Sequence, residues 1–163
     1  MATELVVADS GPLIALARIG RLELLPRLYQ KIHVPRAVFA ETAEGARAGS
    51  LEIRGATWLE VIDVDAGAVA PLLLSVDRGE AEAMVLARSL SDATLLVDDA
   101  RGRVVARRLG LRVRGTVGVL LQAKAAGLLE SIRECLDALE DGGVFVGREL
   151  QAEALRLADE PPT

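Results

Sequence analysis

The chain has very few of the residues that form disulfides, thiolate metal sites or imidazole catalysts. It contains one cysteine, Cys135, and one histidine, His33, in 163 residues. A single cysteine excludes an internal disulfide and leaves a zinc site without its usual thiolate ligands. His33 lies far in the sequence from any serine placed for a catalytic triad, so we expect it to be structural. The lone thiol fits a reducing cytoplasm, where we expect the protein to be.

Long apolar segments and aromatic residues are also scarce. The longest uncharged run, residues 66–76, is too short to span a bilayer. The N-terminus has neither the positively charged region nor the hydrophobic segment of a signal peptide. We therefore expect a soluble protein that does not contact membranes. The isolated Tyr29 and Trp58 do not form a stacking platform for single-stranded nucleic acid. The net charge of -5 argues against a uniformly basic surface, but it allows a local basic groove.

Short apolar runs alternate with longer helical patterns along the chain. This alternation predicts one α/β domain with a mainly parallel sheet that is covered by helices on both faces. We place this domain at residues 1–158, followed by a short tail at 159–163. The predicted strands are residues 5–8, 32–34, 59–62, 94–97 and 111–113.

Helix signals fill most of the sequence between these strands. The predicted helices are residues 10–19, 21–29, 35–45, 79–90, 101–109, 117–126, 129–139 and 149–157. Residues 49–55, between two glycines, are expected to form a loop. In the last helix, Leu150, Ala154 and Leu157 are expected to share an apolar stripe that packs on the domain or contacts a partner.

Acidic residues follow two of the predicted strands directly. Asp9 follows the first strand, and Asp98 and Asp99 follow the fourth. If these strands are neighbours, three carboxylates converge in the crevice at the carboxyl ends of the sheet. Such a cluster is costly unless a cation occupies it. Oxygen ligands without thiolate or imidazole favour Mg²⁺ or Mn²⁺, and such ions assist attack on a phosphodiester.

Each of these acids also has an ordinary explanation. An aspartate between a strand and a helix is typical of a helix cap, and this applies to Asp9 and Asp98 taken singly. Glu41 and Glu80 lie on predicted helices, where a glutamate is usually a solvated side chain. Only the combination of all these acids favours a metal site.

Four segments in order carry a resemblance to a known family. VVADSGPLI (6–14), VPRAVFAET (34–42), RGEAEAMVLA (78–87) and LLVDDAR (95–101) resemble PIN-domain proteins, most closely a subgroup described as predicted nucleic-acid-binding proteins. The resemblance extends from about residue 4 to residue 127. It implies a Rossmann-like three-layer α/β/α sandwich whose acidic site binds Mg²⁺ or Mn²⁺ and cuts RNA.

The family's acidic residues can be carried onto this sequence one by one. The first aspartate falls on Asp9, the helix-borne glutamate on Glu41 and the last aspartate on Asp98 or Asp99. The third acid, usually aspartate, falls on Glu80. Asp9, Glu80 and Asp98 or Asp99 are the implied metal ligands, and Glu41 ligates directly or through water. Many small PIN proteins are VapC-type toxins, so a toxin role, a cognate antitoxin and a homodimer are also implied.

Several other residues are candidates for RNA contacts. Arg101 and Arg103 begin a basic segment directly after the two aspartates, and their guanidinium groups suit phosphate oxygens. The same arginines can equally form a solvated helix face. Ser10 and Thr116 are each expected to be helix N-caps, and each can also contact the metal site or RNA.

Three functions compete at this point. The first is a metal-dependent endoribonuclease of PIN type, which could be the toxin of a type II toxin-antitoxin pair. The second is a non-catalytic PIN-like module that binds nucleic acid or protein. The third, a phosphoacceptor domain, fits poorly because the acidic pair lies late in the chain and no lysine follows at the late strand. Metal-dependent cleavage separates the first two.

Overall fold

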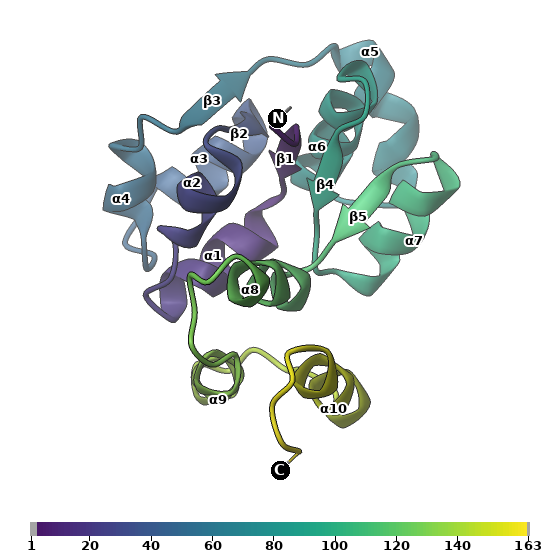
Figure 1. Ribbon diagram of the computed structural model, residues 1–163. Helices are drawn as coiled ribbons and strands as arrows, with labels where there is room; N and C mark the ends of the chain where they lie inside the picture. Colours follow the sequence, from purple (N-terminus) through teal and green to yellow (C-terminus); the bar gives the residue numbers. More distant parts are fainter. Residues whose placement is uncertain (1–2, 163) are drawn as a thin grey trace.

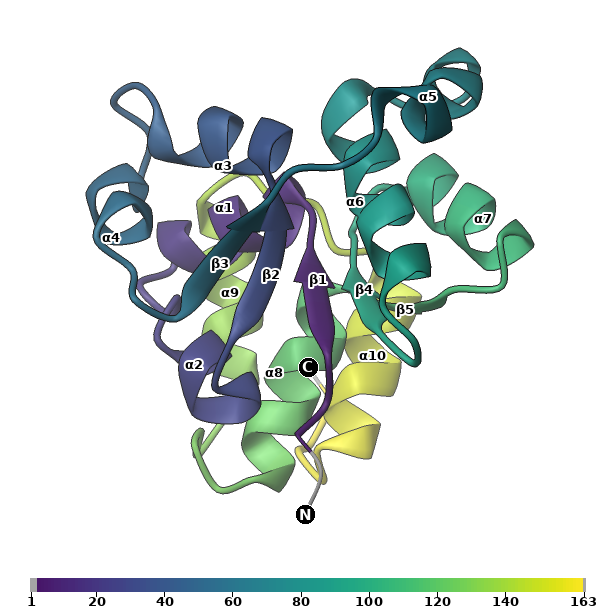
Figure 2. The same cartoon turned by 90° about the horizontal axis from the view of Figure 1, so that it is seen from above.

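A five-stranded, entirely parallel sheet forms the centre of the protein. The computed structural model describes residues 3–162, and the strand order is β3-β2-β1-β4-β5. The strands are β1 (Val6–Ala8), β2 (Ile32–Pro35), β3 (Leu59–Ile62), β4 (Thr94–Leu96) and β5 (Arg112–Arg114). Figure 2 shows them side by side in this order. Each predicted strand is confirmed, with ends that agree to within one residue.

Helices cover both faces of this sheet, which confirms the predicted α/β/α sandwich (Figure 1). They are α1 (Ser10–Arg18), α2 (Leu24–Tyr29), α3 (Arg36–Ala43), α4 (Ser50–Arg54), α5 (Ala66–Val69), the 3-10 helix η1 (Ala70–Leu74), α6 (Arg78–Ser89), α7 (Ala100–Arg108), α8 (Thr116–Ala125), α9 (Arg133–Asp141) and α10 (Arg148–Leu157). In Figure 1, α9 and α10 lie beyond α8, on its side away from the sheet. Within residues 3–162, each helix is too short or too polar to cross a lipid bilayer.

Alternate residues of the central strands face two different hydrophobic clusters, as the pleat of a strand requires. Val6, Ala8 and Leu96 belong to the cluster that includes α1 and α8. Val7 and Leu95 belong to the cluster that includes α6 and α7. Burial of both faces explains why these strands are continuous apolar runs without alternation.

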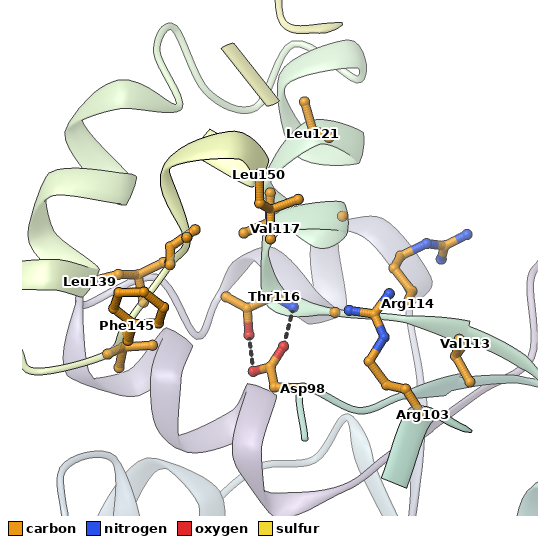
Figure 3. A pocket seen from close by; sticks show the side chains of 15 residues that line it. Asp98, Arg103, Val113, Arg114, Thr116, Val117, Leu121, Leu139, Phe145 and Leu150 are labelled. Carbon is orange, nitrogen blue, oxygen red and sulfur yellow. Dashed lines mark hydrogen bonds between the residues drawn. The ribbon is translucent and has the colours of Figure 1, made fainter. Parts of the chain in front are cut away.

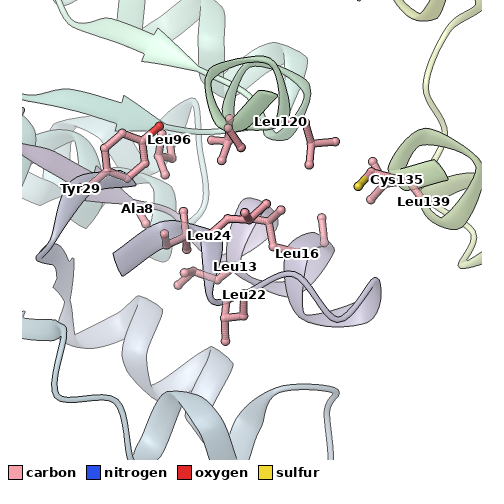
Figure 4. Packing of buried hydrophobic residues seen from close by; sticks show 14 of the residues in the cluster. Ala8, Leu13, Leu16, Leu22, Leu24, Tyr29, Leu96, Leu120, Cys135 and Leu139 are labelled. Carbon is pink, nitrogen blue, oxygen red and sulfur yellow. The ribbon is translucent and has the colours of Figure 1, made fainter. Parts of the chain in front are cut away.

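The larger cluster joins the C-terminal helices to the sheet. Figure 4 shows Leu13 and Leu16 of α1 opposite Leu120 of α8, with Cys135 and Leu139 of α9 beside them. All five side chains are buried. The burial of Cys135 raises the pKa of its thiol, which agrees with a structural role for this residue.

Two details differ from the sequence predictions, and one further segment, for which no structure was predicted, is helical. The expected loop at residues 49–55 contains α4, which begins after Gly49 in a left-handed conformation (φ 81°) and buries Ile53. The uncharged run at 66–76 forms α5 and η1. In α10 only Ala154 of the predicted stripe packs on the domain, together with Leu155, whereas Leu150 and Leu157 are exposed, so a partner contact of this stripe stays a prediction.

The C-terminal end of the described chain is held by Glu160. Its carboxylate accepts hydrogen bonds from the Lys124 ammonium at 2.8 Å, the Ser131 hydroxyl at 3.0 Å and the backbone N–H of Ile132 at 2.6 Å. Burial alone would raise the pKa of Glu160, but these hydrogen bonds outweigh it and lower the pKa to about 2. The chain therefore remains packed as far as Glu160.

Candidate active site

The candidate site lies where the strand order of the sheet reverses. β2 and β3 follow β1 on one side, whereas β4 and β5 lie on the other side. The backbone N–H of Asp9 donates to the carbonyl of Leu96 at 2.9 Å, so the ends of β1 and β4 are adjacent. In open α/β sheets, the crevice at such a reversal is the usual ligand site. Asp9, Asp98 and Asp99 thus leave the sheet at one place.

Asp9 occupies the N-cap position of α1 without capping it. Its backbone is extended (φ -81°, ψ 169°), but its side chain forms no capping hydrogen bond. The residue is 5% exposed, and its Oδ1 atom is buried without a hydrogen-bond partner among residues 3–162. A buried carboxylate oxygen without a partner is costly, so helix capping does not explain this residue.

Neighbouring acids make ionisation of Asp9 still less favourable. Burial raises its pKa to about 7, and the negative charges of Asp77, Glu41 and Asp98 add to that rise. The backbone N–H of Ser10 has the opposite effect, but it is outweighed. The charges of three acids from separate segments therefore act on Asp9 at close range.

Glu80 is a second acid of the site, and it is partly buried. It lies in the first turn of α6, and its Oε2 atom is also buried without a partner among residues 3–162. Burial raises the pKa of Glu80 to about 8, assisted by a side-chain hydrogen bond with Asp77 and by the charges of Asp77, Asp9 and Asp99. Asp77 is the N-cap of α6, and its Oδ1 accepts the backbone N–H of Glu80 at 2.8 Å.

A glycine makes room for Glu41 beside Asp77. Glu41 is an exposed residue of α3, and its Oε2 lies 3.2 Å from the position that a Cβ atom would take at Gly79. Asp77 Oδ1 lies 3.6 Å from that same position. The absence of a side chain at Gly79 thus lets a glutamate of α3 approach the N-terminus of α6.

A second glycine makes room for Glu80 beside Asp99. A Cβ atom at Gly102 would lie 2.5 Å from Glu80 Oε2 and 3.5 Å from Asp99 Oδ2. Asp99 is the N-cap of α7, and its Oδ2 accepts the backbone N–H of Gly102 at 2.7 Å. Only glycine at this position allows Glu80 to reach the first turn of α7 without a clash.

Asp98 is held by the first residue of α8. Its Oδ1 accepts the backbone N–H of Thr116 at 2.7 Å, and its Oδ2 accepts the Thr116 hydroxyl at 2.6 Å (Figure 3). Both aspartates of the pair therefore bind a helix N-terminus, Asp98 that of α8 and Asp99 that of α7. A carboxylate oxygen accepts more than one bond, so each remains able to ligate a metal. The choice between them stays a prediction.

Two predicted helix caps were wrong by one residue. Asp9 and Gly115, not Ser10 and Thr116, have the extended backbone of an N-cap. Ser10 and Thr116 are instead the first helical residues. Thr116 is 4% exposed and donates its hydroxyl to Asp98, so it positions an acid, and a contact with RNA stays a prediction.

Comparison with protein families agrees with this acidic crevice. The family model described as a PIN domain matches residues 5–160 of the chain. The chain belongs to the PIN-domain family. No curated protein and no solved structure matches it. The PIN domain indicates a nuclease-like module, and its match extends over the segments that supply all the acids described above.

Asp77 is the acid of this PIN domain that sequence reasoning missed. Its charge raises the pKa of both Asp9 and Glu80, so it lies within the acidic group. The signal was present in the sequence, because Asp77 stands three residues before Glu80 at the head of an alanine-rich helix. That spacing is also typical of a capping box, which accounts for Asp77 as a helix cap. There was therefore no separate reason in the sequence to place Asp77 near Asp9.

The arginines after the acidic pair do not form one surface. Arg101 is exposed and lines an open depression together with Asp77, Glu80 and Asp99. Arg103 is half-buried and lines a separate groove beside Asp98. Arginines later in the predicted basic segment are used in ion pairs with acids, Arg112 with Asp92 at 3.9 Å and Arg114 with Glu4 at 3.0 Å. Arg114 also lines the groove beside Asp98, but its guanidinium group is paired with Glu4.

The acids of this PIN domain fit a divalent cation by their chemistry. The two partnerless oxygens and the raised pKa values show that the group carries more negative charge than its protein surroundings balance. Carboxylate oxygens are the ligands that Mg²⁺ and Mn²⁺ prefer. Among residues 3–162, no three Asp, Glu, His or Cys side chains lie close enough together to hold a metal ion in the arrangement seen here. The site is therefore an open group of carboxylates.

Proposed function

We propose that this PIN domain is a Mg²⁺- or Mn²⁺-dependent endoribonuclease. The observation that carries the proposal is the pair of buried oxygens, Asp9 Oδ1 and Glu80 Oε2, which lack hydrogen-bond partners among residues 3–162. Either a proton or a cation must balance such groups. The acids come from four separate segments. A divalent cation explains why they converge, because it needs several carboxylate ligands, whereas protonation of one carboxylate needs no other acid nearby.

The chain's own residues would have distinct roles in hydrolysis. Asp9 and Glu80 would hold the divalent ion, together with Asp98 or Asp99. Glu41 would complete the site directly or by orienting a water molecule from its exposed position. When bound, the ion supplies the charge that activates water and stabilises the leaving oxygen during attack on a phosphodiester. Thr116 would keep Asp98 in position through its 2.6 Å hydrogen bond.

Nucleic acid is the substrate class that the surrounding charges support. Arg101 lines the same depression as Glu80, and Arg103 lies beside Asp98. Guanidinium groups bind phosphate oxygens in a bidentate manner, and they would offset the repulsion between an anionic strand and the acids. Ser10, at the start of α1 next to Asp9, would add a hydroxyl contact at the same edge.

Cleavage of end-labelled RNA by the purified chain tests this proposal. Cuts should appear with Mg²⁺ or Mn²⁺, disappear with EDTA and fall by at least about 100-fold in Asp9→Asn. Asp63→Asn is a matched control, because Asp63 also follows a parallel strand but is exposed and paired with Arg36 at 2.5 Å. Cleavage that persists in EDTA, or in Asp9→Asn, would contradict the proposal. Metal binding without cleavage of any RNA would favour a non-catalytic binding module.

The biological role we propose is the toxin of a type II toxin-antitoxin pair, with a cognate antitoxin protein and a homodimer. Family membership supports the toxin and the antitoxin, and the 57% exposure of Leu157 on α10 supports a contact between two copies of the chain.

Two experiments test these parts. Expression of the chain should arrest growth, and co-expression of the neighbouring gene should relieve the arrest. Leu157→Glu should shift a dimer to a monomer in light scattering. Normal growth, or a monomeric wild type, would contradict these parts separately.

A further inference from the structure

A groove of about 370 Å³ opens next to the acidic group, and its apolar part has none of the roles described above. Its walls are formed by the start of α8, the end of α9 and the segment that leads into α10 (Figure 3). Val117, Leu121, Leu139 and Leu150 supply apolar surface inside it. This volume is within the range of small-molecule sites, and the apolar lining is typical of them.

The polar end of the groove is shared with the candidate active site. Asp98, Arg103 and Thr116 all line it, and Figure 3 shows them together. Arg103 Nη1 and Asp98 Oδ1 lie 3.2 Å and 3.0 Å from the position that a Cβ atom would take at Gly115. A ligand in the groove would therefore extend directly to the place where the scissile phosphate is expected.

Phe145 marks the opposite, apolar end. It lines the groove and is 90% exposed, and Leu150, which also lines the groove, is 47% exposed. An aromatic side chain with this exposure contributes little to the stability of the fold, since almost none of its surface is removed from water. The chain has only four aromatic residues, so the exposure of Phe145 next to a groove indicates a contact with a ligand.

The charge of the groove narrows the choice of ligand. Within residues 3–162, Arg103 forms no ion pair closer than 4.0 Å. Asp98 is the only acidic residue of the described chain that lines the groove, and Thr116 already donates to both of its oxygens. An apolar protein segment would remove water from Arg103 without replacing its hydrogen bonds, whereas a phosphate would pair with it.

We propose that this groove is a subsite for one nucleotide of single-stranded RNA, with its base stacked on Phe145 and its phosphate against Arg103. The subsite lies beside the scissile phosphate and rests on the proposed function, because it positions the same substrate. Stacking on an aromatic ring is tolerant of base identity, so the subsite holds the strand without selecting a sequence by itself.

Binding measured without cleavage tests the subsite. Fluorescence anisotropy of a labelled oligouridylate is recorded in EDTA with Asp9→Asn as the reference protein. Adding Phe145→Ala should weaken binding by at least about fivefold, the lower limit for loss of one stacked base. Leu51→Ala is the matched control, since Leu51 is 76% exposed on α4 and does not line the groove. Equal affinity with and without the Phe145 ring would overturn the subsite.

Two further variants separate stacking from general apolar contact. Phe145→Trp should retain the affinity, and the new indole fluorescence should be quenched when oligouridylate binds, beyond any change from Trp58. Phe145→Leu should lose affinity like Phe145→Ala. Equal binding by the leucine and tryptophan variants, or no added quenching, would overturn stacking and leave the groove to a protein ligand.

Arg103 provides the electrostatic arm of the test. Arg103→Gln should reduce the dependence of log affinity on log salt concentration by roughly one phosphate contact. An unchanged salt slope would overturn the phosphate assignment. These binding results are independent of cleavage. Metal-dependent cleavage with unchanged Phe145→Ala binding would sink only the subsite, and weaker Phe145→Ala binding by a chain that never cleaves would sink only the nuclease.

Discussion

The carboxylates of Asp9 and Glu80 lie in one acidic group, and the charge of Asp9 acts on Glu80. Each has one carboxylate oxygen that is buried without a hydrogen-bond partner among residues 3–162. Burial raises the pKa of Glu80 to about 8, and the charges of Asp77 and Asp9 contribute to that rise. Asp9 directly follows β1 and Glu80 lies in α6, 71 positions later, so two distant residues share one environment that suits a cation. This relationship leads to the predictions that follow.

Stability of the metal-free protein should decrease as the pH rises. The folded-state pKa values of about 7 for Asp9 and about 8 for Glu80 exceed the ordinary values of 3.8 and 4.5. The folded state therefore binds protons more tightly than the unfolded chain, and the stability it gains is lost as pH rises through 7 to 8. In EDTA, Tm should be lower at about pH 8 than at about pH 6.

Glu160 does not obscure this window, because its lowered pKa of about 2 affects stability only at more acidic pH. Asp9→Asn should reduce the slope of Tm against pH, and saturating Mn²⁺ should raise Tm most at the higher pH. A Tm that increases from about pH 6 to about pH 8 in EDTA would show that the acids are balanced by something else.

Asp77→Asn should weaken metal binding while the helix remains intact. Asparagine caps a helix as well as aspartate does, so α6 should keep its start. The loss of one negative charge near Asp9 and Glu80 should reduce Mn²⁺ affinity on the order of fivefold, which calorimetry can measure. Asp65→Asn is the control, because Asp65 caps α5 by the same contact, with Ala68, outside the acidic group. Equal losses in both variants would assign the effect to capping alone.

Gly102→Ala should disable the site without unfolding the protein. The new Cβ atom would meet Glu80 Oε2 at 2.5 Å and displace it. Alanine favours a helix interior over glycine by about 1 kcal/mol, so Tm should not fall. RNA cleavage should drop on the order of tenfold or more, as expected for a displaced metal ligand.

Gly55→Ala controls for the general effect of this substitution, since its Cβ would make only an ordinary 3.5 Å contact with the Leu51 carbonyl. Unchanged cleavage and metal affinity in Gly102→Ala, at unchanged Tm, would remove Glu80 from the site.

The Thr116 hydroxyl should matter through Asp98. Thr116→Val removes the 2.6 Å hydrogen bond and should cost about 1–3 kcal/mol of stability together with about 10- to 100-fold in metal affinity. Thr116→Ser keeps the hydroxyl and should retain most of the affinity. If the serine and valine variants bind Mn²⁺ equally, Asp98 does not depend on this contact and Asp99 becomes the stronger candidate ligand.

The sequence was a good guide to the sheet and a poorer one to local detail. The central strands β1 and β4 were predictable because each is a short apolar run buried on both faces. α4 was missed because five residues between glycines carry no helical period, and only the burial of Ile53 reveals its packing. The positions of the caps before α1 and α8 depend on backbone angles that the sheet imposes on Asp9 and Gly115.

The sequence also indicated the strand ends that carry the acids, although the roles of these residues stay predictions. Asp9 and Asp98 could be placed at one edge of the sheet from the pattern alone. The glycines that admit Glu41 and Glu80 could not be interpreted, because their neighbours come from other helices. The groove beside Phe145 was equally hidden, since the segments that form it are distant in sequence.

Mn²⁺ binding to the metal-free chain is the most direct test of the acidic site. Titration by electron paramagnetic resonance would compare the wild type with Asp9→Asn, Glu80→Gln and the control Asp63→Asn. The wild type and the control should bind Mn²⁺ with similar affinity, and the other two variants should lose at least about tenfold. Equal binding by all four folded proteins would contradict the claim that the buried oxygens of Asp9 and Glu80 hold a divalent ion.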